Sequence, residues 1–224
     1  EALSKHASQE IKDKYLSKLV SGEWTGTMNL TEPHAGSDVG ALTTKAVPNG
    51  DGSYNIFGTK IYITYGDHDL SENIVHLVLA RTPDSPPGTK GISLFVVPKN
   101  IVNDKGDLIE RNDLKCTSLE KKLGIHASPT AVMLYGEKQG AKGWLIGEEN
   151  KGMRCMFTMM NHARIGVGVE GLAIAERSYQ QAVDYAFSRK QGKRPIPVSS
   201  DYVPIIEHPD VKRMILDMKS KIDA

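Results

Sequence analysis

The hydrophobic pattern of this chain changes its period near Asn150, and that change constrains the fold more than any other feature. Before it, apolar residues come in short runs separated by turn residues. After it, they are spaced three or four apart, and no proline occurs from Lys151 to Arg194. Such spacing predicts a helix, which at this length would extend roughly 60 Å at 1.5 Å per residue. The chain therefore predicts a strand-rich part followed by a long bundle helix.

The strand-rich part runs from about residue 24 to residue 147. Glycine- and proline-containing turn signals separate short apolar runs there, with no helical pattern between them. Short strands in that arrangement are typical of an antiparallel sandwich or barrel. The runs that predict strands are residues 55–64, 74–81, 92–98, 130–135 and 144–146.

Helices are also predicted at both ends of the chain. Residues 8–20 carry a one-sided apolar stripe, with Ser8 as the N-cap and Gly22 as a left-handed stop. Near the other end, a proline-containing loop over residues 192–208 precedes Pro209, which suits a first helical turn. A last apolar stripe follows Pro209. Methionines at helical spacing after Asn150 are interpreted as core.

These elements predict an α+β fold. We expect a middle domain that is an antiparallel β-barrel or sandwich, flanked by an N-terminal helix and by the first helices of a C-terminal helical bundle. The expected boundaries are residues 1–23, 24–149 and 150–224. Neither end of the chain resembles a natural terminus, so we expect part of a longer protein.

The composition excludes several classes of protein. The 224 residues are 39% hydrophobic and 25% charged, and the net charge is +1, so we expect no bulk attraction to nucleic acid or to an anionic membrane. No apolar run approaches the roughly 20 residues that span a bilayer. Cys116 and Cys155 have no metal-ligand spacing and fit a reducing compartment. The histidines form no pair with zinc-ligand spacing, so no metal site is expected.

Residues 27–40, TMNLTEPHAGSDVG, read as a strand that opens into a loop of small residues. Exposed backbone N–H groups beside a hydroxyl can cradle a phosphate or the edge of a polar ring. The same residues are also the commonest in ordinary turns. On physical grounds alone, both interpretations remain open. The loop lacks the G-x-S-x-G frame of a hydrolase.

The glycine pattern at residues 166–171 has the spacing of a dinucleotide-binding fingerprint. That fingerprint requires a strand before it and the start of a helix at it. Here a helical pattern runs into the glycines and continues after them. We interpret them as positions of close helix approach rather than as a nucleotide site.

Four separated strings resemble the acyl-CoA dehydrogenase family in order and spacing. They are LTEP with AGSD at residues 30–38, GTKIYIT at 58–64, LG through serine at 123–128, and Arg164 with YAFSRK at 185–190. The resemblance covers nearly the whole chain, from the end of an N-terminal helical domain into a C-terminal four-helix domain. The short segment after Arg189 resembles the larger subgroup that includes methylmercaptopropionyl-CoA dehydrogenase.

This resemblance implies bound FAD. The backbone of Leu30 and the hydroxyl of Thr31 would face the isoalloxazine, Ser37 would reach the pyrophosphate, and Tyr62 stands where the family usually has tryptophan. Arg189 would reach the FAD of a neighbouring subunit, with Gln191 beside it. The residues implied to bind the cofactor are Met28, Leu30, Thr31, Gly36, Ser37, Tyr62, Thr64, Arg189 and Gln191.

The substrate implied by the resemblance is an acyl-CoA, held by Ser37, Ser128 and Arg164. Ser128 matches a pantetheine contact and Arg164 a position near the thioester arm; Arg164 could equally pair with a carboxylate of the helical domain. In the family, a carboxylate removes the proton alpha to the thioester while a hydride leaves the beta carbon for the flavin. Some members carry that carboxylate on the long helix, at the position of Ala163 here. We therefore assign no catalytic residue, and expect the base beyond Ala224 and this chain alone to be inactive.

The partners implied are an electron-transferring flavoprotein and sister subunits, in a homodimer or homotetramer. The expected compartment is the bacterial cytoplasm or the mitochondrial matrix. Two alternatives remain from the residues. One is an acyl-CoA oxidase or flavin monooxygenase of the same fold, and the other is a β-domain that binds a partner without catalysis.

Overall fold

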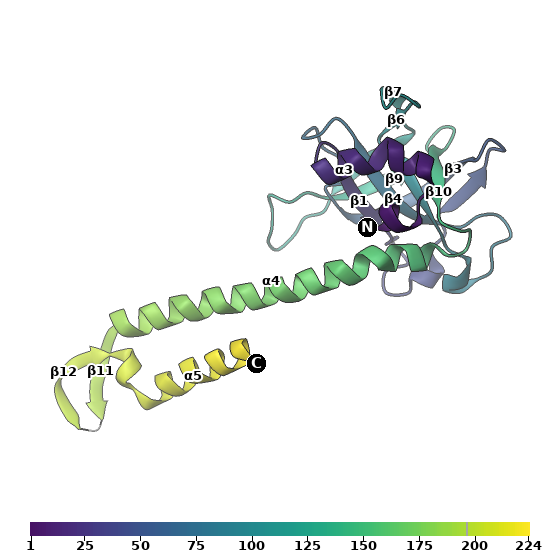
Figure 1. Ribbon diagram of the computed structural model, residues 1–224. Helices are drawn as coiled ribbons and strands as arrows, with labels where there is room; N and C mark the ends of the chain where they lie inside the picture. The colour runs from purple at the N-terminus through teal and green to yellow at the C-terminus, as the bar shows by residue number, and fades with distance from the viewer. Residues whose placement is uncertain (196) are drawn as a thin grey trace. The chain divides into compact units, whose positions relative to one another are not determined.

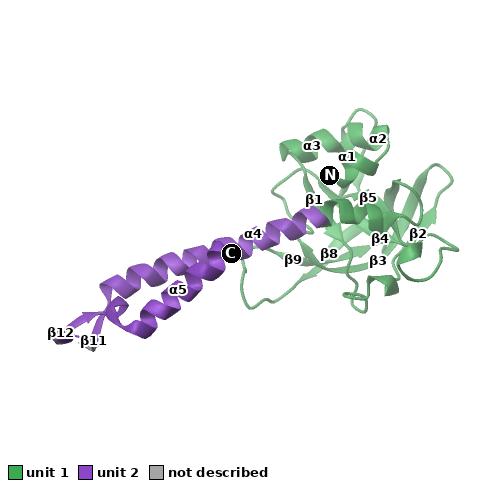
Figure 2. Ribbon diagram, turned by 60° about the horizontal axis from the view of Figure 1, so that its bottom comes forward, with its two compact units in different colours: residues 1–160 green, residues 161–224 purple. Residues whose placement is uncertain are grey.

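The structure is a computed structural model that describes residues 1–195 and 197–224. The chain forms two compact units, Glu1–Met160 and Asn161–Ala224, which are coloured separately in Figure 2. Each unit is described by itself below.

An eight-stranded sheet forms the centre of the first unit (Figure 1). Its strands lie in the order β1-β4-β5-β10-β3-β9-β8, with β2 beside β3. All the pairs in this sheet are antiparallel except β1 with β4, which are parallel. Their bounds are β1 Thr25–Asn29, β2 Lys45–Pro48, β3 Ser53–Thr64, β4 Ile74–Ala80, β5 Ser93–Pro98, β8 Leu114–Leu119, β9 Thr130–Tyr135 and β10 Ala141–Ile146. A small hairpin joins β6 (Asn100–Val102) to β7 (Leu108–Arg111).

The predicted α+β class with a largely antiparallel sheet is confirmed. Each of the five predicted strand runs coincides with an observed strand. Strands β2, β6, β7 and β8 were not predicted. In β8 most side chains are exposed or half-exposed, so its residues, LKCTSL, carry no strong apolar alternation.

The core lies on both faces of this sheet. All residues of β4 and β5 are buried, as expected for central strands covered on two sides. One cluster contains Tyr15, Trp24 and Met156, so the N-terminal helices and the first turns of the long helix pack on one face. The other cluster contains Phe95 and Met133. Met156 is fully buried and belongs to the core as predicted, whereas Met153, Met159 and Met160 are partly buried and pack against it.

The N-terminal helical segment runs over residues 9–21. It comprises α2 (Gln9–Ile11), a π-helical turn (Lys12–Leu16) and α3 (Ser17–Ser21). The Ser8 side chain accepts a hydrogen bond from the Ile11 N–H, and Gly22 adopts φ +80° after the last turn. Both predicted helix ends are therefore confirmed. A short helix before it, α1 (Ala2–His6), was not predicted.

The long helix is α4 (Gly152–Ser188), and α5 (Pro209–Asp223) follows in the second unit with its proline in the first turn. Both helices were predicted. The predicted loop over residues 192–208 is wrong, because most of it forms a hairpin of β11 (Lys190–Pro195) and β12 (Val198–Pro204). Pro195 and Pro204 close these strands, where a missing N–H interrupts no ladder. Residue 196 lies outside the described residues.

Glycines 166, 168 and 171 all lie within α4. Because the helix continues through them, they cannot form the strand-to-helix turn that binds a dinucleotide phosphate. Within the described residues, a Cβ at any of these positions would meet nothing beyond its own stretch of helix within 4 Å. These glycines are therefore accessible to a neighbouring surface. In the same described part of the chain, no helix combines the length and apolarity needed to cross a bilayer.

Candidate functional site

A β-bulge in β3 determines which side chains reach the candidate site. Lys60 pairs with Met133 and Ile63 with Ala131, so Ile61 and Tyr62 together oppose the single residue between those partners. Tyr62 has φ +62°, which a bulky residue rarely adopts. Bulges of this kind redirect side chains next to functional sites.

The bulge places Lys60 on a different side of the strand from Tyr62 and Thr64, although regular alternation would place all three on the same face. In a regular strand, residues 60, 62 and 64 would point the same way. Here Lys60 is completely buried, whereas Tyr62 is 61% exposed and Thr64 is exposed. One strand can therefore supply a buried cation to the interior and two hydrogen-bonding side chains to the surface.

A hollow of about 660 Å³ receives those outward side chains. Met28, Tyr62 and Thr64, which were predicted to bind the cofactor, all line it. Its other walls come from the N-terminal helices, β1, β4 and the first turns of α4, and include Leu3, Leu19, Trp24, Leu77 and Met159. A largely apolar hollow of this volume with a few hydroxyl groups is typical of cofactor and small-molecule sites.

The segment after β1 lies beside the bulge. The backbone N–H of Ile61 donates to the Thr31 carbonyl at 2.9 Å. A Cβ placed on Gly36 would lie 3.8 Å from the Thr31 methyl group. Ser37 follows on the exposed loop. The structure therefore gathers Thr31 and Gly36 near the strand that carries Tyr62.

Ser128 lies at the end of the loop that leads into β9. The carbonyl of its neighbour Pro129 accepts a hydrogen bond from the Tyr65 N–H at 2.9 Å, and Tyr65 lines the hollow. Lys122 donates to the Ser128 carbonyl at 2.5 Å and to the Ile125 carbonyl at 2.8 Å, which holds the loop together. Ser128 itself lines a separate hollow beside the end of β8 and the start of β9, and only its neighbour Pro129 contacts the hollow that contains Tyr62.

Glu32 and Lys60 form a buried ion pair directly behind this segment. Their charged atoms are 2.9 Å apart, and the two side chains are only 2% and 0% exposed. Glu32 also accepts hydrogen bonds from the backbone N–H and hydroxyl groups of Thr43 and Thr44. Lys60 also donates to the Leu30 carbonyl at 3.0 Å. The pair therefore connects three segments of the site.

Glu32 and Lys60 lie within the two strings of the family resemblance, but neither was expected to have a role. A signal for Lys60 was present, since a lone lysine in the strand run GTKIYIT is unusual for a buried strand. Charged residues are almost never fully buried unless they are paired. Nothing in the local sequence identified its partner, which lies 28 positions away.

Electrostatics keeps both members of the pair charged near neutral pH. Burial by itself raises the pKa of Glu32, but the charge of Lys60 and the hydrogen bonds from Thr44, Lys60 and Thr43 lower it to about 2. Burial lowers the pKa of Lys60 to about 8, against the opposing effect of Glu32. Removing either partner would leave an uncompensated charge in the interior.

The stability of the fold is expected to fall in acid through Glu32. Its pKa is lowered from 4.5 to about 2 in the folded chain, so the stabilisation is complete above pH 4.5 and is lost as the pH falls toward 2. The loss amounts to about 3 kcal/mol. Urea unfolding at pH 5 and pH 2.5 would measure most of it, about 2 kcal/mol. Glu32→Gln should show a smaller pH dependence over this window, and an unchanged dependence would contradict the assignment.

A second buried network holds β1 from its inner side. Tyr135 Oη donates to Asn29 Oδ1 at 2.8 Å, Asn29 Nδ2 donates to Thr27 Oγ1 at 2.8 Å, and Thr27 Oγ1 lies 2.7 Å from His76 Nδ1. Thr27 and Asn29 alternate with Met28, which faces the hollow. Burial lowers the pKa of His76 to about 3, so its imidazole is neutral near pH 7. The network connects β1 to β4 and β9.

Tyr135→Phe is expected to lower the free energy of unfolding by about 1–3 kcal/mol, because Asn29 Oδ1 would lose its donor in a fully buried place. Chemical denaturation measures the change. Tyr54→Phe is the matched control. The Tyr54 ring packs edge-on against that of Phe95, with 4.9 Å between the ring centroids, and Tyr54 has no side-chain hydrogen bond among the described residues. Equal effects of the two substitutions would argue against the network.

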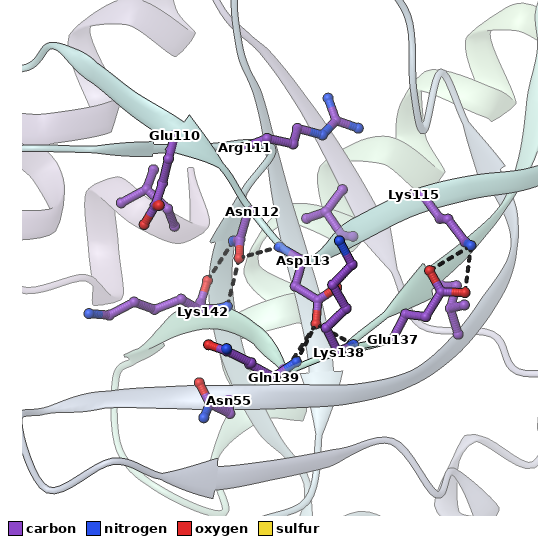
Figure 3. A pocket seen from close by; sticks show the side chains of 14 residues that line it. Asn55, Glu110, Arg111, Asn112, Asp113, Lys115, Glu137, Lys138, Gln139 and Lys142 are labelled. Atoms are coloured by element: carbon purple, nitrogen blue, oxygen red, sulfur yellow. Dashed lines mark hydrogen bonds and ion pairs between the residues drawn. The ribbon is translucent and has the colours of Figure 1, made fainter.

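Another hollow, of about 600 Å³, contains none of the predicted site residues (Figure 3). Several of its polar side chains hold the surrounding backbone or one another. Asp113 accepts from the backbone N–H groups of residues 138–140 at 2.8–3.0 Å, and Lys115 contacts Glu137 at 2.6 Å. The Asn112 side-chain NH2 donates to the Pro98 and Lys142 carbonyls, and its oxygen accepts from the Lys142 N–H. These bonds hold a turn, so we do not consider this hollow the functional site.

Three predicted site residues belong to the second unit. Arg189 donates to Gln191 Oε1 at 3.2 Å, so these two lie together at the start of the β11–β12 hairpin. Arg164 donates to the amide oxygen of Asn161 at 3.5 Å on α4. Their roles toward a cofactor or substrate stay predictions.

Comparison with known proteins identifies the family. The family profile described as acyl-CoA dehydrogenase, middle domain, matches residues 27–138, and that of the acyl-CoA dehydrogenase C-terminal domain matches residues 150–224. The chain belongs to the acyl-CoA dehydrogenase family. The predicted resemblance is therefore confirmed.

Individual relatives agree with this assignment. The chain is 59% identical over 221 residues to 3-methylmercaptopropionyl-CoA dehydrogenase of Ruegeria pomeroyi, and 46% identical over 225 residues to a butyryl-CoA dehydrogenase of Syntrophomonas wolfei. Each alignment covers 98% of this chain but 37% of the relative. The solved butyryl-CoA dehydrogenase of Megasphaera elsdenii superposes with a TM-score of 0.77 at 28% identity, covering 99% of this chain and 52% of that one.

The residues of this acyl-CoA dehydrogenase family chain fit a flavin. The exposed ring of Tyr62 and the apolar wall around Met28 offer surfaces to a flat aromatic group, and Thr64 offers a hydroxyl. Among the described residues, no acceptor is bonded to the Thr31 N–H, which leaves a donor for a polar ring edge. The same described residues contain no cluster of three or more His, Cys, Asp or Glu side chains that could hold a metal ion.

Proposed function

We propose that this chain is part of an FAD-dependent acyl-CoA dehydrogenase that forms the alpha,beta double bond of an acyl-CoA thioester. The observation that carries the proposal is the apolar hollow that Tyr62 and Thr64, exposed by the β3 bulge, line together with Met28. The names of the relatives, a methylmercaptopropionyl-CoA and a butyryl-CoA dehydrogenase, support a thioester substrate. Both relatives are bacterial, and we place the activity in the bacterial cytoplasm.

The residues of the chain would share the work as follows. Met28, Leu30, Thr31, Tyr62 and Thr64 would hold the flavin ring, whose bound form supplies the hydride acceptor. Backbone N–H and hydroxyl donors at its polar edge would tune its electron affinity. The exposed loop at Gly36 and Ser37 would meet the pyrophosphate.

The remaining contacts belong to the substrate and to the assembly. Ser128 and Arg164 would bind the pantetheine and thioester arm, together with Ser37. Arg189 and Gln191 would reach the FAD of a neighbouring subunit in a homodimer or homotetramer. An electron-transferring flavoprotein would accept the electrons. The domain boundaries proposed for this assembly remain residues 1–23, 24–149 and 150–224.

The catalytic base is proposed to lie outside this chain. Abstraction of the alpha proton needs a carboxylate at the substrate, and α4 has Ala163 where some members of the family have glutamate. The 224-residue chain with FAD, an acyl-CoA and an artificial electron acceptor is therefore expected to show no turnover. Measurable turnover would overturn this assignment of the base.

Flavin binding tests the proposed function. The chain, or a longer protein that contains it, is expected to bind FAD with the absorbance of an oxidised flavin, and acyl-CoA should bleach that absorbance in the longer protein. Absence of flavin binding would favour a partner-binding β-domain instead. Stoichiometric peroxide in air would favour an oxidase.

A further inference from the structure

We propose that the buried Glu32–Lys60 ion pair is a positioning pair, which sets the Leu30–Thr31 peptide so that its N–H faces a flavin ring. The inference rests on the proposed function, because it assumes that a flavin occupies the outer side of this segment. Neither residue would touch the cofactor. Both would act through the Leu30–Thr31 peptide.

The contacts of Lys60 indicate this role. Its ammonium group is completely buried and donates to Glu32 Oε1 at 2.9 Å and to the Leu30 carbonyl at 3.0 Å. Glu32 is in turn fixed by Thr43 and Thr44, from a segment that follows the loop. The Leu30 carbonyl is therefore held toward the interior by a cation whose own position is determined by a second anchored side chain.

Peptide geometry carries this orientation to the outer side. In a planar trans peptide, the carbonyl and the N–H point in opposite directions. Because the Leu30 carbonyl points at buried Lys60, the Thr31 N–H of the same peptide points away from the interior. The Thr31 carbonyl accepts from Ile61 at 2.9 Å, which fixes the next peptide as well. Tyr62 and Thr64 are exposed on β3, the strand that Ile61 joins to Thr31.

Stability alone does not account for the pair. A buried ion pair is on average no more stabilising than well-packed apolar residues of similar volume, since both charges lose their hydration. A short apolar pair would fill the same space. Such a pair could not donate a hydrogen bond to the Leu30 carbonyl. The Thr31 N–H of the same peptide would then have no fixed orientation toward the polar edge of a ring.

The test is the double variant Glu32→Gln/Lys60→Met, which removes both charges together. It leaves one amide oxygen at position 32, which can accept from one of the Thr43 and Thr44 N–H groups that now bond separate carboxylate oxygens. Its affinity for FAD, followed by quenching of flavin fluorescence, is expected to fall by about tenfold or more. At saturating FAD, the absorption maximum of the bound flavin should also shift, because the hydrogen bond to its polar edge has changed. A purely structural role would leave that spectrum unaltered.

The matched control is Lys115→Met/Glu137→Gln, the same chemical change at an exposed ion pair in the hollow of Figure 3. It should bind FAD as the parent chain does. A double variant at residues 32 and 60 that melts cooperatively and keeps the parent's FAD affinity and spectrum would overturn the positioning role and leave the proposed function intact. Failure of the parent chain to bind FAD would overturn both.

A second measurement does not depend on the folding of any variant. Amide hydrogen exchange of Thr31 in the parent chain should slow when FAD is added, because the N–H gains an acceptor. Exchange at Glu137, in the turn held by Asp113, should not change. Binding of FAD without protection of the Thr31 amide would also overturn the inference.

Discussion

Lys60→Met alone is expected to lower the free energy of unfolding by about 3–5 kcal/mol, because it leaves the Glu32 carboxylate buried without its counter-charge. Glu32 is 2% exposed, and Lys60 contacts its Oε1. His34 lies 3.7 Å from the other oxygen, on a ring that is half exposed, so it does not replace the ammonium group. Marginally stable domains have only about 5–15 kcal/mol to lose. Denaturant titration at pH 7 would measure the effect.

The double variant Glu32→Gln/Lys60→Met should recover most of that loss. Replacing both partners removes the unpaired charge, and such exchanges are often nearly neutral for stability. The two stability measurements together therefore separate the electrostatic contribution of the pair from its proposed effect on FAD. If the double variant were as unstable as Lys60→Met, the loss of packing rather than the unpaired carboxylate would be the cause.

Trp24→Ala is expected to cost about 3–5 kcal/mol, as truncation of a large buried aromatic side chain does. Trp24 is 1% exposed, its ring centroid lies 6.1 Å from that of Tyr15, and its backbone N–H donates to the Lys18 carbonyl. The cavity would open under residues 9–21, where Trp24 also lines the hollow. Thermal melting followed by near-ultraviolet circular dichroism would report both the stability and the packing.

Trp24→Phe provides the comparison. The indole Nε1 is buried without a hydrogen-bond partner in the described part of the chain, so replacing the indole by phenyl removes an unsatisfied donor while it keeps most of the ring. Its cost should be clearly smaller than that of Trp24→Ala. Equal costs would mean that the shape of the indole, and not its volume, holds the helical segment.

Local signals predicted most elements of this fold. The period of the apolar residues identified α4 and the predicted strands, and Ser8, Gly22 and Pro209 marked helix ends because caps depend on the adjacent backbone alone. Elements without such signals were missed. The β11–β12 hairpin is polar and rich in proline, and its pairing, such as Lys190 with Pro204, joins residues that no local pattern relates.

The candidate site divides in the same way. Four strings together predicted the family, and the family resemblance selected Met28, Tyr62 and Thr64, which the structure brings to one hollow. Ser128 lines a separate hollow, and only its neighbour Pro129 contacts Tyr65 of the first one. Arg164, Arg189 and Gln191 belong to the second unit, and their roles toward a cofactor or substrate stay predictions.

The change from a strand-rich part to helices, the long helix and the family all follow from the amino-acid sequence alone, because periodicity, caps and motifs are local. The direction in which the β3 side chains face does not. In a regular strand, residues 60, 62 and 64 would all face one side of the sheet, and no residue between them indicates a bulge. Pairing with β9, far along the chain, makes Ile61 and Tyr62 oppose one residue. That non-local pairing sends Lys60 inward to Glu32 and Tyr62 outward to the hollow.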